Sequence, residues 1–331
     1  MSSDPRPLRL IDLPILALSS QRVHPNQAIT LRSLASQGTD GLATWDLIRA
    51  SSRFARGRKI WISRDGSTLL GVAGVRRRSG RIAWEIDHLV TTTANEAFLL
   101  DLLDRVVATA GADGAHRLFL RVAQDSDVLA TALRHGFTVA TEETLFEATP
   151  TPNPSHDASR RSARRRHRSD DHALFRLHSQ EVNQEVRWLT ALSPAEWRAA
   201  QEPLGANGSE WVVATADDSG AQALTRISQN SAGVGVSILS ATATTASGPA
   251  DSKDFDASAL ALDVALGQSK DSERFRLLVP DHAIQTARAA QAVGLREVGG
   301  FSLLVRPIAQ RTHRLQIAER AVEGSARPVI Q

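Results

Sequence analysis

The stretch LFLRVAQDSDVLATALRHGFTVATEETLFEA, residues 118–148, decides the fold, because its order of elements returns in FRLLVPDHAIQTARAAQAVGLREVGGFSLLV, residues 275–305. Each stretch predicts an apolar strand, an amphipathic helix, a glycine followed by an apolar residue, and a closing strand. Gly136 and Gly294 hold matched positions in the two stretches. The match indicates an internal repeat that covers most of the chain.

The repeat extends toward the N-terminal side of both stretches. RKIWISRDGSTLLGVAGV (58–75) and GSEWVVATADDSGAQALTRI (208–227) each predict a strand with a tryptophan, an acidic turn with a glycine, and a second strand. Trp61 therefore corresponds to Trp211. The spacing between matched residues is longer at the glycines than at the tryptophans, so the second copy has extra residues before its central helix.

Short helices are predicted just before each tryptophan hairpin. ATWDLIRAS (43–51) carries Trp45, and PAEWRAAQE (194–202) carries Trp197. Each copy then contains a first strand, one or two helices, three meandering strands, a long helix, a strand, a helix and a closing strand. This order predicts an α+β fold with a mixed sheet.

The endings LATALRHGF and ARAAQAVGL, together with this element order, resemble the GNAT superfamily of acyl-CoA-dependent N-acyltransferases, here in tandem. The resemblance implies two GNAT-like domains, each a mixed, mostly antiparallel sheet flanked by helices. We expect an N-terminal domain over 8–148, a linker rich in Pro, Ser and Arg over 149–168, a C-terminal domain over 169–308, and a tail over 309–331.

The resemblance also implies a place for acetyl-CoA. In that superfamily a splayed fourth strand receives the pantetheine arm, and a glycine-rich loop with the next helix N-terminus holds the diphosphate. These correspond to RIAWEIDHLV (81–90) and TTTANEA (91–97). The residues that would contact the cofactor are then Leu89, Val90, Thr92, Ala94 and Glu96.

Neither copy keeps the glycines of that loop. Side chains near Thr92, Ala94 and Glu96 would crowd a diphosphate, and Glu96 would add a negative charge beside it. The matching connection in the second copy, 240–260, has only Gly248 and several aspartates. Both diphosphate loops are therefore predicted to be degenerate.

Acyl transfer needs a base for the amine and a proton donor for the leaving thiolate. The candidate bases are Glu85 and Asp87, which alternate onto one face of the predicted fourth strand, with His88 on the other face. The alternative is that this face points to solvent and simply carries charges. The chain has no tyrosine, so the donor would be Ser, His or water.

A run of arginines, SRRSARRRHR (159–168), follows a Pro- and Ser-rich segment. It is interpreted either as an anion-binding arm or as a solvated connector that runs into the next domain. The arginines concerned are Arg160, Arg161, Arg164, Arg165 and Arg166.

Composition excludes several classes of function. With no cysteine there are no disulfides, thiolate nucleophiles or Cys-ligated zinc, which fits a cytoplasmic protein. A net charge of +3 is too mild for a dedicated nucleic-acid protein, and no stretch suits a membrane span. The histidines lack metal-ligand spacing, and GVGVSIL (233–239) lacks the third glycine of a dinucleotide loop.

Two hypotheses follow. The first is a GNAT-like N-acyltransferase that uses acetyl-CoA or another acyl-CoA on a small amine or a peptide amine, with the first copy as the active one. The second is a GNAT-fold pseudoenzyme that serves as a binding or structural module. Neither involves a metal, a nucleic acid or a membrane.

Overall fold

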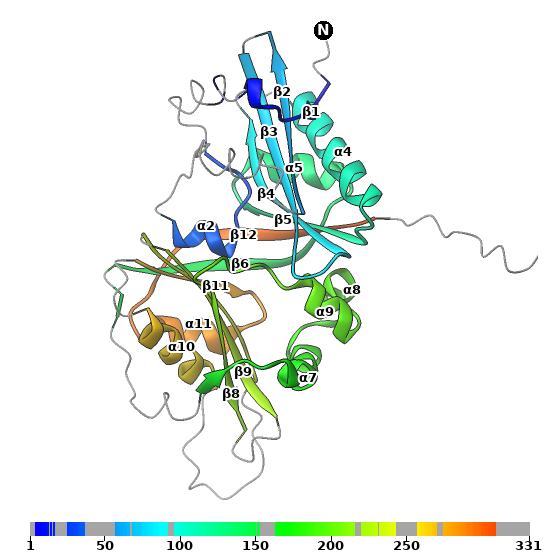
Figure 1. Cartoon of the computed structure of the whole chain (residues 1–331). Helices are drawn as coiled ribbons and strands as arrows, with labels where there is room; N and C mark the ends of the chain where they lie inside the picture. Colours follow the sequence, from blue (N-terminus) through cyan, green and yellow to red (C-terminus); the bar gives the residue numbers. More distant parts are fainter. Residues whose placement is uncertain are drawn as a thin grey trace, which may run out of the picture.

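The computed structural model describes residues 4–12, 14, 16, 25–36, 57–66, 68–91, 96–149, 151–152, 163–215, 220–230, 232–242, 257–269 and 274–308. The strands in these residues form one mixed sheet in the order β1-β2-β3-β4-β5-β12-β6-β11-β10-β9-β8-β7 (Figure 1). Helices pack against both ends of this long sheet. The α+β class is confirmed.

The first half of the chain follows the predicted element order. Its fourth strand, expected over 81–90, is β4, and its central helix is α4. The elements are β1 (Arg6–Pro7), η1 (Leu10–Asp12), α2 (Leu31–Ala35), β2 (Arg58–Asp65), β3 (Thr68–Arg77), β4 (Ala83–Thr91), α4 (Glu96–Ala112), β5 (Arg117–Ala123), α5 (Asp127–Arg134) and β6 (Thr138–Ala148).

The second half repeats this order with three helices before its hairpin. The helix expected around Trp197 is confirmed, whereas the one around Trp45 lies outside the described residues. The elements are β7 (Ala163–Arg165), η2 (Arg168–Asp170), α7 (Asp171–Glu181), α8 (Gln184–Thr190), α9 (Pro194–Ala200), β8 (Ser209–Ala214), β9 (Ala221–Asn230), β10 (Gly233–Ser240), α10 (Ala257–Gln268), β11 (Phe275–Pro280), α11 (Ile284–Ala292) and β12 (Arg296–Pro307).

The closing strands of the two halves are exchanged. β12 lies between β5 and β6, with Phe301 opposite Ala123, and β6 lies between β12 and β11, with Phe146 opposite Leu277. Each half therefore completes its sheet with the last strand of the other half. Because both edges of each closing strand are paired, the halves hold each other together through main-chain hydrogen bonds.

Each half buries its own apolar core between the sheet and two helices. In the first half α4 and α5 cover a cluster that includes Trp84, Leu102 and Leu118. In the second half α10 and α11 cover a cluster that includes Val236 and Leu277 (Figure 1). The buried residues of α4 recur at helical spacing, and burial of such an apolar stripe drives the docking of a helix on a sheet.

The repeated glycines end the last helix of each copy. Gly136 and Gly294 have φ of 83° and 85°, a left-handed conformation in which a Cβ would be strained. The glycines of GVGVSIL have a different role, since this segment is strand β10. A Cβ on Gly235 would overlap the carbonyl oxygen of Leu31, so this glycine lets α2 pack directly on the strand.

Both copies begin with the same small motif. Arg6 Nη1 donates to Asp12 Oδ2 at 2.8 Å, and Arg164 Nη1 donates to Asp170 Oδ2 at 2.7 Å. In each copy the aspartate ends a short 3-10 helix after a short strand. The first strands β1 and β7 thus lie before the domain starts that were expected at residues 8 and 169.

The arginine run forms part of the fold. β7 pairs with β8 inside the stretch expected to be a linker, and Arg165 lies over the Trp211 ring at 5.2 Å. Arg166 pairs with Asp171 at 2.6 Å and with Glu210 at 2.7 Å. The solvated-connector and anion-arm interpretations are therefore wrong for Arg164 and Arg166, because carboxylates of the protein hold their side chains. Arg165 is exposed beside Trp211.

The remaining two arginines of the run, Arg160 and Arg161, lie outside the described residues. Within the described part of the chain, no helix is both long enough and apolar enough to cross a bilayer.

Candidate active site

The fourth and fifth strands of the second copy separate and open a cavity. β10 pairs in parallel with β11 only from Val234–Phe275 to Ser237–Leu278, although β10 continues to Ser240. Beyond Ser237 the edge of β10 that faces β11 has no strand partner among the described residues. The cavity at this point has a volume of about 230 Å³.

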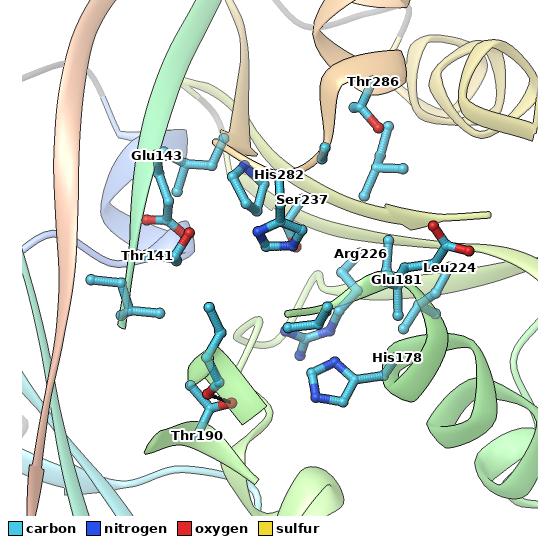
Figure 2. Close-up of a pocket in the computed structure, with 18 of the residues that line it drawn as sticks. Thr141, Glu143, His178, Glu181, Thr190, Leu224, Arg226, Ser237, His282 and Thr286 are labelled. Atoms are coloured by element: carbon cyan, nitrogen blue, oxygen red, sulfur yellow. Dashed lines mark hydrogen bonds between the residues drawn. The ribbon is translucent and has the colours of Figure 1, made fainter. Parts of the chain in front are cut away.

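The cavity lies where the two halves meet. Its walls come from β9, β10, β11, the helices α7, α8 and α9, and the start of α11, while β5, β6 and β12 close its inner end. Figure 2 shows polar side chains from these elements around the open space. The labelled polar residues are Thr141, Glu143, His178, Glu181, Thr190, Arg226, Ser237, His282 and Thr286, and the apolar Leu224 is labelled as well.

Two histidines line this cavity from different elements (Figure 2). His282 is the second residue after β11, and its Nδ1 lies 3.3 Å from Asp281 Oδ1. The same carboxylate oxygen accepts a hydrogen bond from Thr141 Oγ1 at 2.9 Å. The carboxylate can therefore hold the imidazole with Nδ1 protonated and leave Nε2 as an acceptor.

The second histidine, His178, lies on α7 between Phe175 and Trp197. Burial, with smaller contributions from Arg187 and His282, lowers the pKa of His178 to about 4. The imidazole is therefore neutral at pH 7. It adds no fixed charge beside His282.

Hydroxyl and carboxylate groups fix the far end of β10. Ser240 Oγ lies 2.8 Å from Ser258 Oγ and 3.2 Å from Thr286 Oγ1, which joins β10 to the first turns of α10 and α11. Glu181 on α7 accepts a hydrogen bond from the N–H of Thr242 at 2.9 Å. The open edge of β10 is thus held in place from both faces of the sheet.

The first copy has the same strand separation, but its own chain fills it. β4 pairs with β5 only from Ala83 to Glu85. Beyond that point the N–H of Gln27 donates to the Leu89 carbonyl oxygen at 2.8 Å, and the N–H of Ile29 donates to the Arg121 carbonyl oxygen at 2.8 Å. The segment 26–29 therefore bridges β4 and β5 as a strand would.

Asn26 completes this closure with its side chain. Its Oδ1 accepts from the N–H of Leu89 at 2.8 Å, and its Nδ2 donates to the Asp87 carbonyl oxygen at 3.0 Å. The gap that would receive pantetheine in the first copy is thus occupied by main-chain and side-chain hydrogen bonds of the protein itself.

The predicted bases Glu85 and Asp87 are both buried, so the interpretation that they face solvent is wrong. Glu85 accepts from Arg76 Nε at 2.5 Å and from Arg78 Nε at 2.9 Å. Burial raises the pKa of the Glu85 carboxyl, and the two arginines act against this rise. Asp87 pairs with Arg58 at 3.1 Å. Neither carboxylate lines the open cavity of the second copy.

His88 lies on the same side of β4 as Asp87, not on the opposite face as predicted. The register of β3 and β4 shifts at this point, because Gly74 lies opposite His88 whereas the next residue, Val75, lies opposite Ile86. This β-bulge breaks the alternation of side chains. His88 and Asp87 consequently line the same pocket, which is separate from the cavity of the second copy, and in it Arg58 Nη2 lies 2.8 Å from His88 Nδ1.

The predicted cofactor contacts of the first copy have different surroundings. Leu89 and Val90 are buried, and Leu89 bonds to the segment 26–29. Glu96 in the first turn of α4 pairs with Arg134 of α5, with Arg134 Nε donating at 2.9 Å. The other two predicted contacts, Thr92 and Ala94, lie outside the described residues.

Sequence reasoning missed the cavity histidines because it tested histidines only for metal spacing. The repeat itself offered a signal, since His282 is the second residue after the end of the fifth strand of the second copy. His178 had no comparable signal, because the turns of α7 that face the cavity depend on how α7, α8 and α9 pack.

These features define the class: the chain has the tandem GNAT fold. A tandem GNAT protein from the clavulanic acid biosynthesis pathway is similar over 93% of this chain and 99% of that chain, with 12% identity and a TM-score of 0.52. A protein of Pyrococcus horikoshii assigned as an acetyltransferase is similar over 93% of this chain and 90% of that chain, with 7% identity and a TM-score of 0.53. At such identities the likeness concerns the fold alone.

No family model matches the chain, and no curated protein matches it.

Proposed function

We propose that the chain is an acyl-CoA-dependent N-acyltransferase whose active copy is the second one. The observation that carries this proposal is the contrast between the two strand separations. The separation of β10 and β11 opens into a cavity with two histidines, whereas that of β4 and β5 is filled by residues 26–29. This reverses the expectation that the first copy is the active one.

The edge of β10 beyond Ser237 supports the binding of acyl-CoA. Main-chain groups on this edge have no strand partner among the described residues, so they can form hydrogen bonds with the amide groups of a pantetheine arm. The splayed fourth strand plays this role in proteins of this fold. Ser240 and Thr286 place hydroxyl groups beside this edge. The thioester would then lie near Ser237, where the two strands join and the cavity begins.

The chemistry requires one base and one acid. The amine nitrogen attacks the thioester carbonyl carbon, an amide bond forms and the carbon–sulfur bond breaks. We assign His282 as the base that takes the proton from the amine, because Asp281 orients its ring toward the cavity. Ser237, which lines the cavity where β10 and β11 separate, is the candidate donor of a proton to the departing thiolate, since the chain contains no tyrosine.

The test combines binding and turnover. Calorimetry with acetyl-CoA should detect binding, and release of free CoA in the presence of an amine should measure transfer. His282→Gln should lower kcat/KM about 100-fold or more, which is the usual contribution of a general base. His172→Gln, an exposed histidine of α7, is the matched control and should leave the rate unchanged.

Two outcomes would decide against the proposal. Equal rates for His282→Gln and the unaltered chain would remove His282 from the mechanism. Binding of acetyl-CoA without transfer to any amine would instead favour the binding-module hypothesis.

A further inference from the structure

The register of the sheet identifies which main-chain donors point toward the open edge of β10. The N–H of Val234 donates to the Arg274 carbonyl oxygen, on the β11 side, at 2.9 Å. The N–H of Ala241 donates to the Gln222 carbonyl oxygen, on the β9 side, at 2.8 Å. β10 stays in one register with β9 over its whole length, 233–240. Because successive N–H groups alternate between the two edges of a strand, those of even-numbered residues point toward the β11 side.

The pairing of β10 with β11 stops where β11 ends in a proline. Ser237 and Leu278 are the last paired residues. In this register the next N–H of β11 to reach β10 would belong to Pro280, which has none. Beyond this point, the donors that point toward the open edge are the N–H groups of Ser240 and Thr242.

The carboxylate of Glu181 already occupies the second of these donors. Glu181 Oε2 accepts from the N–H of Thr242 at 2.9 Å and from Thr242 Oγ1 at 2.5 Å. Glu181 lies on α7 one turn after His178 and lines the same cavity (Figure 2). These two uncharged groups are its only hydrogen-bond partners among the described residues, so the contact costs little to break.

The diphosphate end of a pantetheine arm would come to this same place. An extended chain rises about 3.3 Å per residue, so Thr242 lies about 16 Å beyond Ser237. With the thioester near Ser237, the arm passes Ser240 and leads its diphosphate toward Thr242. A carboxylate there takes one main-chain donor from the arm and repels the phosphates.

We propose that Glu181 is a gate on the acyl-CoA edge, which it closes by holding Thr242 and which acyl-CoA opens by displacing it. This inference rests on the proposed function, since the edge of β10 is taken as the binding site of the pantetheine arm. Glu181 is half-buried, so a short movement of its side chain brings the carboxylate into solvent. The closed gate lowers the affinity of the protein for acyl-CoA.

Substitutions at Glu181 test the gate. Calorimetry with acetyl-CoA should show at least tenfold tighter binding to Glu181→Ala, which lacks the carboxylate, than to the unaltered chain. Glu181→Gln keeps an acceptor for Thr242 and loses only the charge, so its gain should be smaller. Glu185→Ala removes an exposed carboxylate of α8 outside the cavity lining. This matched control should bind acetyl-CoA as the unaltered chain does.

A thioester without phosphates isolates the blocked donor from the repulsion. S-acetyl-pantetheine has the same arm and no charge, so Glu181→Gln should bind it as the unaltered chain does. Glu181→Ala should bind it at least threefold more tightly, because the N–H of Thr242 becomes available.

The partner residue gives a second route to the same contact. Thr242→Val removes the hydroxyl that holds Glu181, so it should also tighten the binding of acetyl-CoA. Added to Glu181→Ala, it should give no further gain, because both substitutions act on one contact.

The outcomes separate the gate from the proposed function. Equal or weaker binding of acetyl-CoA to Glu181→Ala would overturn the gate, and would mean that Glu181 supports the edge, while acyl transfer stays intact. Tighter binding without transfer to any amine would support the gate and overturn the proposed transferase. If neither the unaltered chain nor any of these variants binds acetyl-CoA, both proposals are wrong.

Discussion

The N–H of Gln27 donates to the carbonyl oxygen of Leu89 at 2.8 Å, and so closes the strand separation of the first copy. At the same place in the second copy, beyond Ser237, no described strand pairs with this edge of β10, and a cavity lies there. One chain thus carries two versions of one cleft, of which the first is sealed by its own backbone.

This difference predicts the stoichiometry of acyl-CoA binding. Because residues 26–29 occupy the edges of β4 and β5, the protein should bind one molecule of acetyl-CoA per chain, as measured by calorimetry. A stoichiometry of two would mean that acyl-CoA displaces the segment 26–29, and would contradict the sealed-cleft account.

Replacing Glu85 with Gln should affect stability and not catalysis. The substitution removes the charged partner that Arg76 and Arg78 share, while both arginines stay buried. The free energy of unfolding should therefore fall by about 3–5 kcal/mol in a urea titration. Glu96→Gln is the control, since its side chain is 47% exposed, and should cost at most about 1 kcal/mol.

The rate of acyl transfer per folded molecule should be unchanged in Glu85→Gln. The prediction from sequence that Glu85 is the general base requires the opposite, a fall of about 100-fold. Single-turnover rates on the folded fraction therefore decide between these two roles of Glu85.

His178 should make stability depend on pH. Its pKa is lowered to about 4 in the folded protein, against an ordinary 6.5, so the unfolded chain binds a proton between these values that the folded chain does not. This contribution to stability is complete above pH 6.5. As the pH falls from 6.5 toward 4, protonation of the unfolded chain lowers the free energy of unfolding by about 3 kcal/mol.

A variant isolates this effect from other titrating groups. His178→Phe keeps an aromatic ring on α7 but cannot take up a proton. Urea titrations at pH 7 and pH 4.5 should show a smaller loss of stability in the variant than in the unaltered chain. Equal losses in both proteins would show that His178 is readily protonated in the fold.

Gly235→Ala should disturb the contact between α2 and β10. Its Cβ would overlap the carbonyl oxygen of Leu31, so the helix must move, at a cost of about 1–3 kcal/mol in the free energy of unfolding. Gly299→Ala is the control, because a Cβ at that position would meet no described atom within 4 Å beyond its chain neighbours. Similar stability of the two variants would contradict the close approach of α2.

Much of the fold follows from local sequence patterns. Alternating residues in 58–75 and 208–227 predict hairpins because the two faces of a strand meet different surroundings. Gly136 and Gly294 mark helix ends because only glycine adopts positive φ without strain. Such patterns recur in both copies, so the repeat and the α+β class could be predicted.

The candidate site could be predicted only in part. The sequence located β4 and its carboxylates, but a β-bulge turned His88 to the side of Asp87, and bulges depend on pairing with a neighbouring strand. The salt bridges of Glu85 depend on where Arg76 and Arg78 lie across the sheet. The alternation of residues within one strand predicts neither a β-bulge nor a salt bridge to a neighbouring strand.

The sequence by itself determined the class of fold, the repeat and the position of most strands and helices, because these depend on residues close together in the chain. The tertiary structure alone decided which cleft is open. Residues 26–29 reach β4 and β5, and β12 reaches β5, through contacts between residues far apart in sequence. Such contacts are set by the packing of the whole chain, since each must offset the entropy of closing a long loop.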